Sequence, residues 1–166
     1  MKKFNLFTLI ISAALLFSCG GDSDDGDGGG TPSGNSLSAT VTGDIAASFS
    51  ASGEVQGQQL VQANLTNGNV LSIVASEGTG YSMAISITDY DGAGSYSLDL
   101  MSANTATFTS VDIETFATTG VTAISGSIEI TVDGDRINGT FDFDGEGNDN
   151  ITASVTGDFS VIPAIN

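Results

Sequence analysis

The stretch ISGSIEITVDGDRINGTFDF, residues 124–143, decides the fold class of this chain. Apolar and polar residues alternate on both sides of Asp133-Gly134, a dipeptide that suits a two-residue hairpin loop. This period-two pattern predicts antiparallel strands with one buried face and one solvated face. We expect strands over residues 124–132 and 135–143, in the register that places Ile130 opposite Ile137.

A third strand over residues 151–161 extends the hairpin into a meander, because apolar and hydroxyl side chains alternate there as well. The loop 144–150 would connect it to the second strand. The expected register pairs Phe141 with Ala153 and places Arg136 opposite Asp158. Such a cross-strand ion pair contributes at most about 1 kcal/mol when it is exposed.

The same alternation recurs along the rest of the chain after residue 36, and no segment there has sustained helical spacing. Asn67-Gly68 marks a second two-residue hairpin loop. The sequence therefore predicts one all-β domain over residues 37–166, an antiparallel β-sandwich or barrel of about nine to eleven short strands. The other expected strands cover residues 37–42, 45–51, 60–66, 69–75, 82–88, 95–100, 105–111 and 116–122.

The N-terminus has the features of a bacterial lipoprotein signal. Lys2 and Lys3 precede an apolar run over residues 4–17, and Cys19, the only cysteine of the chain, follows after Ser18. The run is shorter than the roughly 20 residues that span a bilayer. We expect residues 1–18 to be a signal peptide and Cys19 to carry the lipid, including the palmitate-type acyl chains, that anchors the protein in a membrane. Residues 19–36 would be the lipidated cysteine with a disordered acidic Gly/Asp tether.

Charge and composition exclude several functions. Removal of residues 1–18 leaves Arg136 as the only basic residue against 20 acidic residues. Binding to nucleic acid requires several Lys or Arg residues and is not expected. The chain has no histidine, and most general bases and transition-metal sites need one. We therefore expect a protein that is not an enzyme.

The densest acidic segment, residues 142–150, is the strongest of three candidates for a metal site. Asp142, Asp144, Glu146 and Asp149 supply oxygen ligands at close intervals around two glycines, as a Ca²⁺ loop requires. The segment departs from the EF-hand pattern, whose twelfth position is Glu and here is Ala153. A solvated hairpin loop is the alternative, and no other cofactor is expected. Residues 89–92 and 133–135 are weaker candidates, because both are ordinary turn sequences.

The order of several motifs resembles a known group of proteins. After the cysteine and the acidic spacer come residues 94–98 (GSYSL), 125–130 (SGSIEI), 138–143 (NGTFDF) and 155–159 (VTGDF). This arrangement resembles small uncharacterised outer-membrane and surface lipoproteins of Bacteroidetes-type bacteria. The resemblance implies an all-β domain at the outer membrane, displayed on the cell surface, and it transfers no catalytic residue.

Two functions from different classes remain open at this point. The first is a structural or interaction role of a membrane-anchored surface lipoprotein with an unidentified protein partner. The second is a glycan- or ligand-binding module, with or without the help of Ca²⁺. A binding module should have a concave patch on which acids and Tyr81, Tyr90 or Tyr96 converge, whereas an interaction protein should show a flat polar surface or an unprotected edge strand.

Overall fold

The computed structural model describes residues 34–67, 69–78 and 80–166 of the chain. The expected signal peptide and Cys19 lie outside the described residues, as does most of the expected tether. Almost all described elements are strands, so the all-β prediction is confirmed. The elements are β1 (Ser36–Gly43), β2 (Ala47–Ser52), β3 (Glu54–Val55), β4 (Gln58–Gln59), β5 (Val61–Thr66), β6 (Val70–Ser76), β7 (Tyr81–Ile87), β8 (Gly94–Ser97), β9 (Thr105–Val111), β10 (Thr118–Asp133), β11 (Arg136–Glu146), the 3-10 turn η1 (Asn148–Asn150), β12 (Thr152–Val161) and β13 (Ala164–Ile165).

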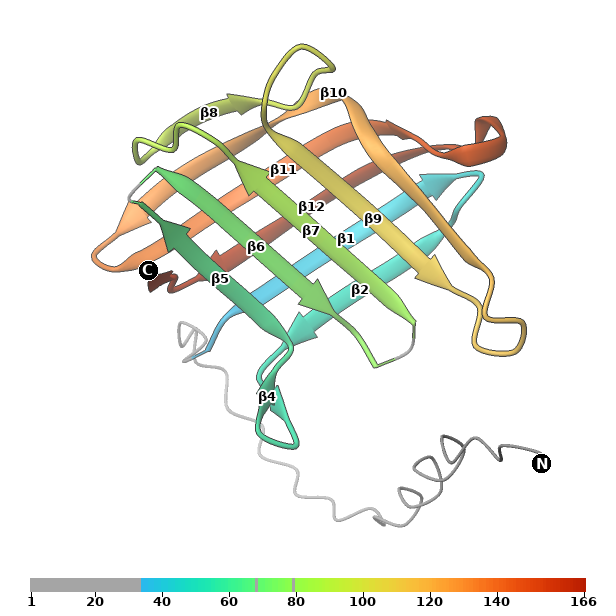
Figure 1. Cartoon of the computed structure of the whole chain (residues 1–166), viewed down its shortest axis with the longest axis horizontal. Coiled ribbons are helices and arrows are strands. Elements are labelled where there is room, and N and C mark those ends of the chain that lie inside the picture. The colour runs from blue at the N-terminus through green and yellow to red at the C-terminus, as the bar shows by residue number, and fades with distance from the viewer. Residues whose placement is uncertain (1–33, 68, 79) are drawn as a thin grey trace, which may run out of the picture. The chain divides into compact units, whose positions relative to one another are not determined.

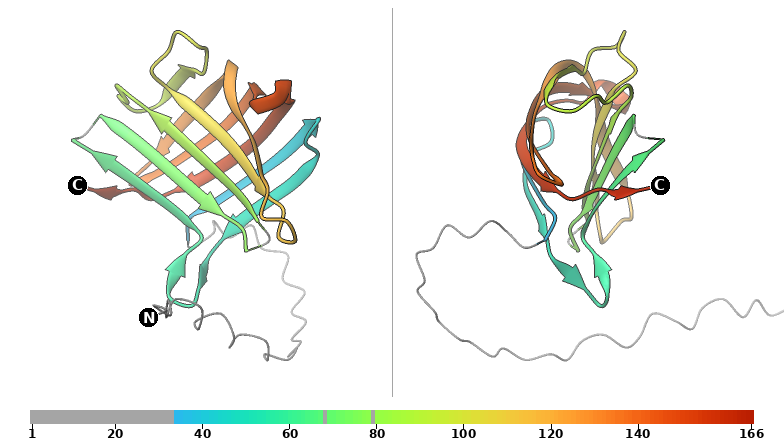
Figure 2. Two further views of the ribbon diagram at one scale, coloured as in Figure 1. Left: turned by 45° about the vertical axis from the view of Figure 1, so that its right-hand side comes forward. Right: turned by 90° about the vertical axis from the view of Figure 1, so that its left-hand side faces the viewer.

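One curled, open sheet forms the domain (Figure 1). Its strand order is β13-β5-β6-β7-β9-β10-β11-β12-β1-β2, β8 pairs with β10, and all neighbours are antiparallel except β13 and β5. The curl turns the sheet into a half-barrel with two layers that face each other, as Figure 2 shows from the side. The front layer contains β5, β6, β7 and β9, and the back layer contains β8, β11, β12, β1 and β2.

Strand β10 belongs to both layers. Its first part, Thr118–Thr122, pairs with β9, its second part, Ser127–Ile130, pairs with β8, and β11 pairs along both from Thr122 to Asp133. A β-bulge separates the two parts at Ile124, and Gly126 follows with a φ of 135°. A bulge bends a strand and increases its twist, so one continuous strand can turn the corner between the layers. The sequence predicted two strands, 116–122 and 124–132, where the structure has this single one.

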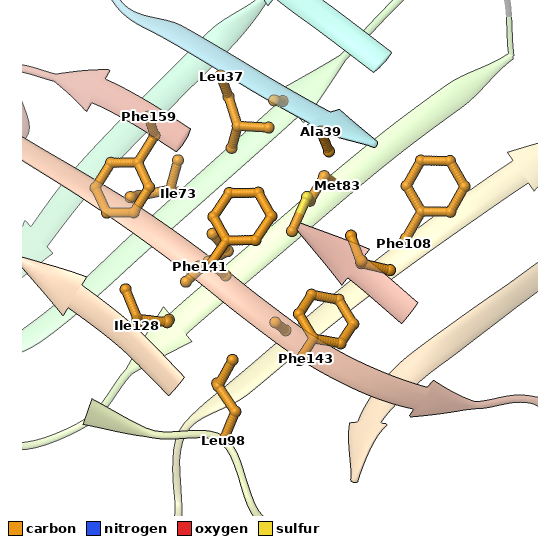
Figure 3. Packing of buried hydrophobic residues seen from close by; sticks show 14 of the residues in the cluster. Leu37, Ala39, Ile73, Met83, Leu98, Phe108, Ile128, Phe141, Phe143 and Phe159 are labelled. Atoms are coloured by element: carbon orange, nitrogen blue, oxygen red, sulfur yellow. The ribbon is translucent and has the colours of Figure 1, made fainter. Parts of the chain in front are cut away.

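The core lies between the layers, and every buried side chain among the described residues is apolar. Side chains from both layers interdigitate there, including Met83 and Phe108 from the front and Phe141, Phe143 and Phe159 from the back (Figure 3). The buried residues run from Leu37 to Val161. Because the compact unit Thr31–Asn166 contains this complete core, we expect it to fold when produced alone.

The predicted meander of the last three long strands is confirmed, but its register is wrong. Ile130 pairs with Gly139, not with Ile137, and the two-residue loop consists of Gly134 and Asp135 because Asp133 pairs with Arg136. Between β11 and β12 the error is four residues, since Phe141 pairs with Gly157 instead of Ala153. Steps of two or four residues keep every side chain on its face, so the alternation cannot distinguish these registers.

Three further expectations need correction. Thr66 pairs with Val70, not with Asn69 as a two-residue loop requires. Strand β8 ends at Ser97, whereas the sequence predicted it to reach residue 100. The short pairs β3–β4 and β13–β5 carry no clear alternation and were not predicted.

Candidate functional site

The outward side chains of the back layer form a regular array, which we call the outer polar face. Cross-strand pairs align them in rows that run from β2 to β8. Neighbouring strands of a sheet lie about 4.8 Å apart, and residues on one face of a strand follow at about 6.7 Å. One row is Ser50, Ser38, Asp158, Thr140, Glu129 and Ser95, and the next is Ser48, Thr40, Thr156, Asp142, Ser127 and Ser97.

Hydroxyl groups and carboxylates of this face are paired across strands. The Ser38 hydroxyl donates to Asp158 Oδ1 at 2.6 Å, and the Ser154 hydroxyl donates to Asp144 Oδ1. The Ser160 hydroxyl donates to Asn138 Oδ1 at 2.7 Å. These bonds hold the short side chains close to the sheet, so the face presents a level layer of hydroxyl and carboxylate oxygens.

The Arg136 side chain does not pair with Asp158, the partner that the sequence predicted. Its Nη1 donates to Ser160 Oγ at 3.0 Å and to the Gly34 carbonyl at 3.2 Å. Asp158, the expected partner, lies opposite Thr140 and Ser38 instead. The four-residue difference in the β11–β12 register accounts for the change.

The four acidic residues that were predicted as a Ca²⁺ site do not surround one point. Asp142, Asp144 and Glu146 occupy alternate positions of β11, about 6.7 Å apart along the strand, and Asp149 lies beyond them in η1. Ca²⁺ needs its oxygen ligands at 2.3–2.6 Å from one centre. Within the described residues no group of three acidic side chains is arranged to hold a metal ion. Pairing with Thr152, Ser154 and Thr156 of β12 keeps this segment extended where the sequence predicted a loop.

Two shallow hollows flank the β10 bulge. One, of about 460 Å³, is lined by residues that include Leu100, Thr122 and Glu146. The other, of about 260 Å³, lies between β1, β11 and β12 and includes Asp144. Ile124 lines both, because the bulge turns this residue out of the regular alternation. The sequence predicted Ile124 to face Phe143, and only the interrupted alternation before Ser125-Gly126 could have indicated the bulge.

The tyrosines take part in packing and do not converge on either hollow. Tyr81 stacks on Phe108 with ring centroids 5.8 Å apart, and Tyr90 stacks on Tyr96 at 5.9 Å. The oxygen of the Tyr96 hydroxyl lies 2.8 Å from each of its two acceptors, Asp91 Oδ1 and the Gly92 carbonyl oxygen. The pKa of Tyr90 is raised mainly by burial and, to a smaller extent, by the nearby Asp91 carboxylate. Burial is also the main cause that raises the pKa of Tyr96.

Two loops at the ends of β9 expose large apolar side chains. In the first, Asp99 Oδ1 accepts hydrogen bonds from the backbone N–H groups of Met101 and Ser102. In the second, Asp112 Oδ1 accepts from Glu114 and Thr115 in the same way. Leu100 and Met101 project from the first loop, and Ile113 and Phe116 from the second. The sequence predicted connections over residues 101–104 and 112–115 but placed Leu100 and Phe116 in strands, whereas β8 ends at Ser97 and β10 begins at Thr118.

The fold and its surface define a class, an all-β half-barrel domain with a hydroxyl- and carboxylate-rich outer sheet face. The chain belongs to the family described as a domain of unknown function (DUF6252), whose model matches residues 49–163. The match begins within β2, although β1 lies between β2 and β12 and completes the sheet. Comparison with curated proteins and with solved structures found no match. Within the described residues no helix has the length and apolar character that a membrane span requires.

Proposed function

We propose that this protein is a lipoprotein of the outer membrane, anchored through Cys19 and displayed on the cell surface, whose β domain has a structural or interaction role and not a catalytic one. The signal-like N-terminus with its single cysteine supports the anchor. The outer polar face is the observation that supports the interaction role. It spans six strands in register, and its side chains are short and exposed or half-buried.

Such a face suits contact with an extended, hydrated partner surface. Protein interfaces other than obligate ones are about as polar as the rest of the surface, and bridging water is common in them. The strands of the front layer, by contrast, contain no charged residue. The strand carboxylates are thus concentrated on the back layer. The two layers therefore differ in charge, and we expect a partner to contact one layer and not the other.

Detergent partitioning in the native host tests the anchor. We expect wild-type protein to enter the detergent phase of Triton X-114 and the Cys19→Ala variant to remain in the aqueous phase, because only the former would carry acyl chains. Ser33→Ala is the matched control and should partition as the wild type does. Equal partitioning of wild type and Cys19→Ala would refute lipidation at this residue. Protease treatment of intact cells then tests display: a domain protected until the cells are lysed is not at the surface.

The hollows beside Ile124 favour a second candidate function, the binding of a glycan or another small ligand. Ligand sites are usually concave and combine apolar walls with a few polar groups, as Ile124, Leu100 and Glu146 do here. A glycan-array screen of the 31–166 domain, with and without Ca²⁺, tests it. Binding that is lost in Ile124→Glu and kept in Val132→Glu, an exposed position on the same strand, would locate the site in the hollows.

A further inference from the structure

The two outermost long strands of the main sheet, β5 and β2, differ in how their outer edges are covered. At one end, the edge of β5 is covered by β13, which pairs Ala164 with Asn64 and Ile165 with Leu65. The Asn35 side chain caps the start of this edge, because its Nδ2 donates to the Val61 carbonyl at 3.2 Å. Its Oδ1 accepts from Ile162 N at 2.8 Å, which ties the covering segment in place.

The other end of the sheet is β2, and its outer edge is open. The strand pairs with β1 through one edge only, and within the described residues no backbone hydrogen bond reaches the other. Natural edge strands are usually blunted by Lys, Pro, a bulge or a covering loop. Strand β2 has the sequence ASFSAS, runs for six residues and pairs regularly from Ala47 to Ser52. None of the usual protective devices is present within this strand.

Charge makes this edge the place where two copies of an acidic protein can approach. The chain has a formal net charge of −17, so copies repel one another at most orientations. Neither β1 nor β2 contains a charged residue. Among the back-layer strands the nearest carboxylate, Asp158, is two strands away, at about 10 Å, which exceeds the screening length of about 8 Å at physiological ionic strength. The exposed Glu54 of β3 lies two residues beyond the end of β2, outside the six residues of this edge. Asp44, before β2, accepts a hydrogen bond from Thr152 N at 2.9 Å and so points toward β12.

We propose that β2 pairs antiparallel with β2 of a second copy, about a two-fold axis perpendicular to the sheet. Such an axis keeps the outer polar faces of both copies on the same side. Outward serines then oppose outward serines, and Phe49 and Ala51 stay in the core of their own copy, where each is buried. Of the registers that satisfy this condition, two keep five residues of each strand paired: Ser50 lies opposite Ser50 of the second copy, or opposite its Ser48. The back layers join into one continuous sheet, and the outer polar face doubles in width.

This pairing deepens the proposed interaction role, and it requires neither the lipid nor a membrane. A single pair of edge strands buries a small area, so the association is weak and reversible. Because the copies repel at long range, raising the ionic strength shortens the screening length and strengthens the dimer. A contact between surfaces of opposite charge would show the reverse dependence on salt.

Sedimentation equilibrium of the 31–166 domain measures the association. We expect a monomer–dimer equilibrium whose dissociation constant falls as NaCl is raised. Ser48→Lys/Ser50→Lys places like charges opposite each other in both registers and should raise this constant at least about tenfold. The matched control Thr140→Lys/Thr156→Lys adds the same charge to central strands of the same face and should leave dimerisation intact. Since both variants lower the net negative charge, a loss confined to the edge variant cannot come from general repulsion.

Cysteine cross-linking tests the geometry independently, because the 31–166 domain has no cysteine of its own. Under oxidation, Ser50→Cys or Ser48→Cys/Ser50→Cys should give a covalent dimer, since opposed residues of an antiparallel pair lie within disulfide range. Thr156→Cys should give little. A wild-type domain that stays monomeric up to about 1 mM overturns the proposal, and so does a dimer that forms equally well with the edge variant. Either result leaves the test of the Cys19 anchor unaffected.

Discussion

At the scale of single residues, glycines opposite phenylalanines select the register of the last three long strands. Gly139 pairs with Phe159, and Gly157 pairs with Phe141. A Cβ atom at Gly139 would meet the Phe159 ring, and one at Gly157 would meet the Phe141 ring. Each ring therefore occupies the space that a missing side chain leaves on the neighbouring strand, an arrangement known to pin registers in sheets.

Gly139→Ala should destabilise the domain by about 1–3 kcal/mol, because the added methyl group forces the buried Phe159 ring out of its position. Gly94→Ala is the matched control: it also lies in a strand of the back layer, and its Cβ would meet nothing within 4 Å. Urea unfolding of the two variants measures the difference. Equal free energies of unfolding would contradict the role given to the Gly–Phe pairs.

At the scale of elements, a loop capped by a carboxylate lies on each side of β9. Backbone N–H groups of Thr115 and Glu114 donate to Asp112 and lower its pKa, and the Ser97 hydroxyl followed by the Met101 and Ser102 N–H groups lowers the pKa of Asp99. The ionised form accepts these bonds, so each cap contributes stability above the ordinary Asp pKa of 3.8. That contribution is lost as the pH falls through the lowered pKa of the folded state.

Asp112→Ala should lower the melting temperature at pH 7, because Glu114 and Thr115 lose their N–H acceptor. The difference from wild type should shrink as the pH falls below 3.8 toward the lowered pKa. Asp135→Ala removes the same charge at an exposed hairpin position and sets the baseline for net charge. Melting curves from pH 7 to pH 2 measure both variants. A constant difference between wild type and Asp112→Ala across this range would argue against a charge-dependent cap.

At the scale of the whole molecule, the described basic side chains are limited to Arg136, while carboxylates line β11 and several loops. Repulsion among them opposes compaction, and the packed apolar core between the two layers offsets it. Screening by salt should consequently stabilise the fold. The ion's charge should matter more than its chemical identity where carboxylates are spread along a strand.

Raising NaCl from 10 to 150 mM should increase the melting temperature of the 31–166 domain by a few degrees, since the screening length falls from about 30 Å to about 8 Å. At matched ionic strength, Ca²⁺ and Mg²⁺ should have similar effects, because Asp142, Asp144 and Glu146 do not surround one point. Thermal melts in the three salts provide the measurement. A larger effect of Ca²⁺ that Asp144→Asn abolishes would show a specific site after all.

The sequence by itself determined the all-β class, the inward and outward faces of the strands and the order of the final meander. Alternation is a local signal: Ile128 and Ile130 point inward whichever residues they face across the sheet. The sequence predicted that this strand ends at Phe143 and that a loop over residues 144–150 follows, whereas β11 continues to Glu146 and spaces Asp142, Asp144 and Glu146 along an extended strand.

Only the tertiary structure decided the registers, the bulge at Ile124 and the open edge of β2. Registers that differ by two residues bury the same side chains, so the choice depends on how Phe141 and Phe159 fit glycines on a strand distant in sequence. An edge depends on which strand is left without a neighbour, and here β13 covers β5 while nothing in the described chain covers β2. These features come from long-range packing and pairing, which the alternation within a single strand does not encode.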